Sequence, residues 1–79
     1  MKLPVIKQLS EQYTLDILRK AEEDLLETGT PGIVVDGDDE GEQLTHILGA
    51  IWVLEQIEQG VPARDALRAF AQKVRTSVS

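Results

Sequence analysis

Hydrophobic positions recur at three- and four-residue spacing along most of the chain, which is the repeat of an amphipathic helix. The pattern predicts four helices, at about residues 4–12, 15–28, 41–59 and 62–77. Thr14 is expected to cap the second helix at its start. Gly29 and Gly60 are expected to end the second and third helices. We therefore expect a single all-α domain over residues 1–79, a compact bundle of three main helices and a short N-terminal helix.

The third predicted helix is apolar nearly all round, because residues 47–54 carry no polar side chain. Such a helix must be covered on most of its sides. At 100° per residue, one broad stripe contains Leu44, Ile47, Leu48, Ile51, Trp52 and Leu54. A second flank contains His46, Ala50, Val53 and Ile57. Two apolar faces need two sets of partners.

We expect the second of those partners to be another copy of the chain. The predicted homodimer interface consists of His46, Gly49, Ala50, Val53 and Ile57, and Gly49 would allow close approach of the helices. The sequence leaves open whether this flank is instead covered within one protomer. Trp52, at the edge of the main stripe, is expected to lie in the core.

The segment between the second and third helices, residues 29–40, is predicted to be an extended acidic loop. Its β-branched part, residues 33–35, is expected to tuck under the helices. Asp36, Asp38 and Glu40 match the first, third and fifth positions of a calcium-binding EF-hand loop, but Ile47 occupies the twelfth position, where a bidentate Glu is needed. These three residues are therefore weak metal candidates only, and we expect the loop to cap the third helix.

The charge of the chain is unevenly distributed. Its 14 acidic and 8 basic side chains give a net charge of −6, which disfavours attraction to nucleic acid or anionic membranes. Most acids lie within residues 16–42, whereas the last helix carries Arg64, Arg68, Lys73 and Arg75. We expect the basic last helix to pair with the acidic second helix, within or between chains. No stretch is long enough to cross a bilayer, so a cytoplasmic location is expected.

Candidate catalytic residues are few. The chain has no cysteine and one histidine, which excludes thiol chemistry and a multi-histidine metal site within one chain. We interpret His46 as a buried histidine at a helix or subunit interface rather than a general base or metal ligand. The sequence thus predicts no enzymatic activity and no cofactor.

Several features resemble a family of small proteins of unknown function found chiefly in Bacteroidetes-type bacteria. They are the start Met1-Lys2-Leu3-Pro4-Val5-Ile6-Lys7, the pair Gly49-Ala50, Gly60, and Ala66-Leu67 with Phe70 and Val74. The resemblance implies an accessory role near thiol-redox proteins of the peroxiredoxin or thioredoxin type. It carries no mechanism, since these are packing and capping residues.

From these observations we expect a small non-enzymatic interaction or adaptor module. One alternative is a small-ligand or cation-binding regulator that uses the acidic loop. A second alternative is a helix-turn-helix-like nucleic-acid binder, because residues 60–62 form a short connection before the basic last helix. No aromatic residue interleaves with the basic side chains, which disfavours that alternative.

Overall fold

The computed structural model describes the backbone of residues 1–78 and the side chains of residues 1–76. Within this part the chain forms four helices, α1 (Leu3–Gln12), α2 (Leu15–Thr28), α3 (Glu40–Glu58) and α4 (Ala63–Val78), and no strand. The predicted all-α bundle is confirmed, and each helix begins and ends within one residue of its predicted bounds.

The helix boundaries follow from local hydrogen bonds. The Thr14 hydroxyl accepts a hydrogen bond from the backbone N–H of Ile17 at 3.3 Å, which caps α2 as predicted. Gly29 follows α2 with a φ of 84°, and its N–H donates to the carbonyl of Leu25. Gly60 has a φ of 98°, and the next N–H, of Val61, donates back to Gln56. Both glycines supply the left-handed conformation that ends a helix at little steric cost.

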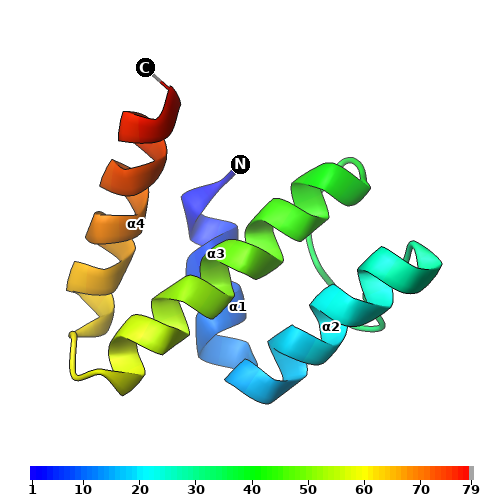
Figure 1. Ribbon diagram of the computed structural model, residues 1–79, viewed down its shortest axis with the longest axis horizontal. Coiled ribbons are helices and arrows are strands. Elements are labelled where there is room, and N and C mark those ends of the chain that lie inside the picture. Colours follow the sequence, from blue (N-terminus) through cyan, green and yellow to red (C-terminus); the bar gives the residue numbers. More distant parts are fainter. Residues whose placement is uncertain (79) are drawn as a thin grey trace.

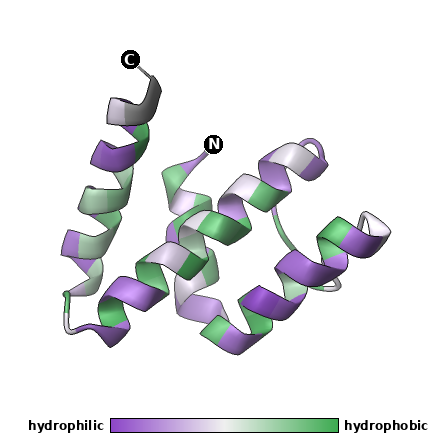
Figure 2. Ribbon diagram, in the orientation of Figure 1, coloured by the Kyte–Doolittle hydropathy of each residue, from purple (hydrophilic) through white to green (hydrophobic). Residues whose placement is uncertain are grey.

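The helix α3 is the centre of the molecule and packs against α1, α2 and α4 (Figure 1). In this view α2 and α4 lie on opposite sides of α3, and α1 crosses behind it. Hydrophobic segments of α3, green in Figure 2, lie where this helix crosses α1. The expectation of a central helix wrapped by its neighbours is confirmed.

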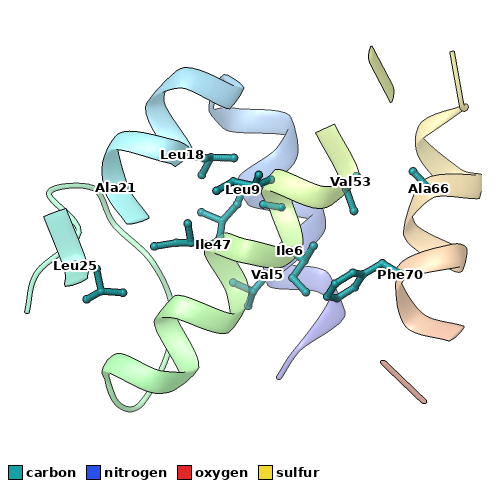
Figure 3. Close-up of a cluster of buried hydrophobic side chains, with 12 residues drawn as sticks. Val5, Ile6, Leu9, Leu18, Ala21, Leu25, Ile47, Val53, Ala66 and Phe70 are labelled. Atoms are coloured by element: carbon teal, nitrogen blue, oxygen red, sulfur yellow. The ribbon is translucent and has the colours of Figure 1, made fainter. Parts of the chain in front are cut away.

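The core consists of side chains from all four helices, shown in Figure 3. Its largest fully buried members are Ile6, Leu18, His46, Ile47 and Val53. Phe70 points from α4 toward Ile6, and its ring centroid lies 5.9 Å from that of the half-buried Trp52. Val78, at the end of α4, has its side chain outside the described part.

The segment between α2 and α3 only partly follows the expectation. Ile33 and Val35 are half-buried and pack on the core, whereas Val34 is 86% exposed. Successive side chains of an extended segment point to opposite faces. Ile33 and Val35 can therefore pack against the helices, whereas Val34 between them points to solvent.

Candidate functional site

The ring of His46 is fully buried and joins three parts of the chain. The backbone N–H of Lys2, at the start of α1, donates to Nε2 at 2.9 Å. Nδ1 lies 2.7 Å from the backbone carbonyl of Asp36, in the acidic loop. Because an amide N–H only donates and a carbonyl only accepts, the ring is neutral and carries its proton on Nδ1. His46 therefore holds the start of α1 and the loop against α3.

The flank predicted as a homodimer interface is core in the structure. His46, Ala50 and Val53 are each 0% exposed within one protomer, Gly49 is buried, and Ile57 is half-buried. The predicted location of the interface is therefore corrected for His46, Gly49, Ala50 and Val53, which the protomer itself buries, whereas the half-buried Ile57 keeps some exposed surface.

Gly49 allows close packing, as the sequence led us to expect, but between helices of one chain rather than between two copies. A Cβ atom at this position would lie 2.7 Å from Cδ1 of Ile6 and 2.9 Å from Cζ of Phe70. Glycine therefore allows side chains of α1 and α4 to meet over the same turn of α3. The open side of α3 is instead around Leu48, which is 43% exposed between the half-buried Leu44 and Trp52.

The acidic loop serves mainly as a cap for α3. Asp39 is the N-cap residue, and its Oδ1 accepts from the N–H of Glu42 at 2.8 Å. Asp36, Asp38 and Glu40 do not converge: within residues 1–78 no three acidic, histidine or cysteine side chains are placed to hold a metal ion. The loop thus has the capping role that the sequence predicts, and the three weak metal candidates stay apart.

A groove lies between α1 and α4, which touch each other only slightly. The groove has a volume of about 630 Å³. Its apolar lining residues, which we call the floor, are Leu3, Ala63, Leu67 and Ala71. Its polar lining residues, which we call the border, are Lys7, Ser10, Glu11, Arg64, Arg68, Gln72 and Arg75. We refer to this surface as the α1–α4 groove.

The border of the α1–α4 groove is positively charged. It contains four of the eight basic residues of the chain and a single carboxylate, that of Glu11. In the part of the chain that the structure describes, Lys7, Arg64, Arg68 and Arg75 make no ion pair. A molecule with a net charge of −6 thus presents one local cationic surface with an apolar floor.

Among the described residues, Arg64, Arg68 and Arg75 of α4 form no ion pair with the acidic helix α2, although the sequence led us to expect such pairs within or between chains. The two helices flank α3 on opposite sides (Figure 1). The ion pairs found among the described residues join Arg19 to Glu55 of α3 at 3.0 Å and Lys20 to Asp24 within α2 at 3.2 Å. The hydrogen bond and the charge of Asp24 raise the pKa of Lys20. The charge of α2 is thus partly balanced locally, whereas Arg64, Arg68 and Arg75 of α4 are exposed to solvent.

A model of one protein family matches the sequence over its whole length, residues 1–79. The chain belongs to DUF6952, a family of unknown function. No curated protein and no solved structure matches this DUF6952 chain. The resemblance that the sequence indicated, to a small family of unknown function, is confirmed.

Sequence reasoning missed the α1–α4 groove as a site, although it identified the basic residues that border it. The signal was the row Ala63, Leu67 and Ala71, which recurs every four residues beside Arg64 and Arg68. The spacing of this row is that of a buried helical stripe, so that the sequence gives no sign of an exposed groove.

No helix of the described chain is both long enough and apolar enough to cross a membrane.

Proposed function

We propose that this DUF6952 protein is a non-enzymatic interaction module that binds a partner protein in the α1–α4 groove. One observation carries the proposal: four cations without a described ion pair border an apolar floor on an acidic molecule. Exposed apolar surface rimmed by polar residues is typical of interaction sites. The unpaired cations can also form charge-assisted hydrogen bonds with the carboxylates of a partner.

The chemistry of the groove supports binding rather than catalysis. Its lining contains no histidine or cysteine. The one histidine of the chain, His46, lies in the core with both ring nitrogens hydrogen-bonded to the backbone. Histidine is the side chain that most often performs general acid–base catalysis, and here it is out of reach of a substrate in the groove.

A connection to thiol-redox proteins fits the same proposal only as a partnership. The chain has no cysteine, so that every thiol in such a system would belong to the partner. The α1–α4 groove is the surface that we propose for holding that partner.

Site-specific photo-crosslinking tests the proposal in the cells that make the protein. A photoreactive residue at Ala71, which lines the groove, is expected to capture a discrete protein adduct. The same residue at the exposed Glu23 of α2 serves as the control and is expected to give no such adduct. Adding Arg68→Glu to the Ala71 variant should remove the adduct, because it reverses a charge at the border.

Two outcomes contradict the proposal. The first is the absence of an adduct from Ala71 in a variant whose helical circular dichroism is intact. The second is a set of adducts that is the same from Ala71 and Glu23, which indicates capture without a specific surface.

A further inference from the structure

We propose, resting on the function above, that the α1–α4 groove binds the apolar face of an acidic amphipathic α-helix of the partner. The groove thus acts as a helix-in-groove site. The helix contributes leucine-like side chains to the floor and carboxylates to the cationic border.

The floor has the shape that helix packing requires. Ala63, Leu67 and Ala71 follow each other every four residues along α4, and Leu3 faces them from α1. Rows at this spacing form ridges, and the ridges of one helix pack into the grooves between the ridges of another. Alanine at both ends of the row lets a partner backbone come close, and the half-buried Leu67 offers a central apolar contact.

The border has the charge distribution of an elongated polyanionic partner. Arg64, Arg68 and Arg75 lie along α4, and the first and last of them are eleven positions apart, which is about 16 Å at the helical rise of 1.5 Å per residue. Lys7 adds a cation on the α1 side. A ligand with a single anionic head group reaches only one part of this border. A helix of three turns reaches all of it when its acids recur every three or four residues.

Other occupants fit the groove less well. A second copy that used the same groove would place four cations against four cations, and like charges across an interface are unfavourable. Nucleic acid is polyanionic, but no aromatic side chain lines the groove for base stacking, and the net charge of −6 opposes its approach. A second copy that offered its acidic α2 would form a head-to-tail contact, which produces rings or open filaments.

The experiment is a titration of the full-length protein with a synthetic, fluorescently labelled peptide. The peptide has four helical turns, leucines along one face and glutamates beside them. Three controls are a peptide of the same composition with the leucines scattered, a peptide with lysine in place of glutamate, and a labelled DNA duplex. We expect saturable binding of the first peptide alone, weakened by salt, with amide NMR shifts centred on Leu67 and Ala71.

Matched double variants locate the charge effect. Arg64→Gln with Arg68→Gln is expected to weaken binding of the acidic peptide about tenfold or more. Arg19→Gln with Lys20→Gln removes the same amount of charge from α2. We expect this double variant to change the affinity for the acidic peptide less than about twofold, because salt screens charges that lie far from the groove.

The inference is overturned when the acidic helix fails to saturate, when the scattered or basic peptide or DNA binds equally well, or when both double variants lose affinity alike. A concentration-dependent rise in mass that Arg64→Gln with Arg68→Gln abolishes would also overturn it, in favour of a head-to-tail second copy. An adduct from Ala71 in cells without binding of the acidic helix refutes the helix and leaves the proposed function standing. Loss of both refutes the two together.

Discussion

The two long helices α3 and α4 bury their apolar residues in different ways. α3 is apolar nearly all round and is covered by the other three helices. α4 packs mainly on α3, through the buried Ala66 and Phe70, and leaves its side toward α1 open as a cationic groove. The most hydrophobic helix is therefore the scaffold, and the more polar helix carries the candidate recognition surface.

This difference indicates where selection for stability and for binding would act. Changes on the covered sides of α3 should alter the free energy of unfolding. Changes on the groove side of α4 should alter binding and leave the fold intact. The predictions below test this division, from the largest expected effect to the smallest.

Ala50→Glu is expected to unfold the protein. Ala50 is fully buried, and a carboxylate there has neither space nor a partner. A buried unpaired charge with overpacking costs about 4 kcal/mol or more, a large share of the stability of a small domain. Circular dichroism and urea denaturation measure the loss.

Leu48→Glu is the control on the same helix. Leu48 is 43% exposed, so the variant should stay folded.

A homodimer remains a proposal, and the side of α3 around Leu48 is where we would place it. Sedimentation of Leu48→Glu beside the unmodified protein checks this placement. A folded Ala50→Glu variant would contradict the assignment of its flank to the core.

His46→Ala is expected to lower the free energy of unfolding by about 3 kcal/mol, because it removes a buried ring and leaves the Lys2 N–H and the Asp36 carbonyl without partners. Thr45→Ala, at an exposed neighbouring position, should change stability by less than about 0.5 kcal/mol.

The tautomer of His46 can be observed directly. Nitrogen NMR of the ring should show a proton on Nδ1 and none on Nε2 at neutral pH. A proton on Nε2 would be incompatible with the Lys2 contact, since two donors would face each other.

Gly49→Ala is expected to destabilise the protein by about 2 kcal/mol, although alanine is the better helix former by about 1 kcal/mol. Its Cβ would press on Ile6 and Phe70, one from α1 and one from α4. The control is Gly41→Ala in the first turn of α3, where the added Cβ would lie 3.4 Å from Oδ1 of Asp39, an ordinary van der Waals contact. Gly41→Ala should be neutral or stabilising in urea denaturation, and equal losses in both variants would contradict the close packing at Gly49.

Arg68→Gln is expected to change the free energy of unfolding by less than about 0.5 kcal/mol, because its exposed side chain makes no described ion pair. Arg19→Gln breaks the contact with Glu55, whose exposure limits the cost to about 1 kcal/mol or less. Thermal unfolding of both variants measures the difference. A larger loss from Arg68→Gln would assign that residue a structural role and weaken the case for a binding border.

Much of the fold could be predicted because its signals are local. The spacing of Leu18, Ala21 and Leu25 defines the buried face of α2, and Thr14 and Gly29 define its ends. Hydrogen bonds and steric limits at these positions involve residues only a few places apart, which is why the four helices were located within one residue.

The candidate site could not be predicted in the same way. Ala63, Leu67 and Ala71 have the spacing of a buried stripe, and only the position of α1 leaves them at the floor of a groove. His46 likewise acquires its partners from Lys2 and Asp36, residues that the helical pattern does not bring together.

Four helices, their caps, a net negative charge and a helix that must be covered on most sides all follow from the residue pattern. Which side of α3 is covered follows only from the packing of the four helices. A helix that is apolar all round has no preferred inner face of its own, so its orientation depends on the neighbours that fit, here through the space above Gly49. The same packing leaves Arg64, Arg68 and Arg75 of α4 exposed beside α1, because the buried Ala66 and Phe70 set how α4 lies on α3.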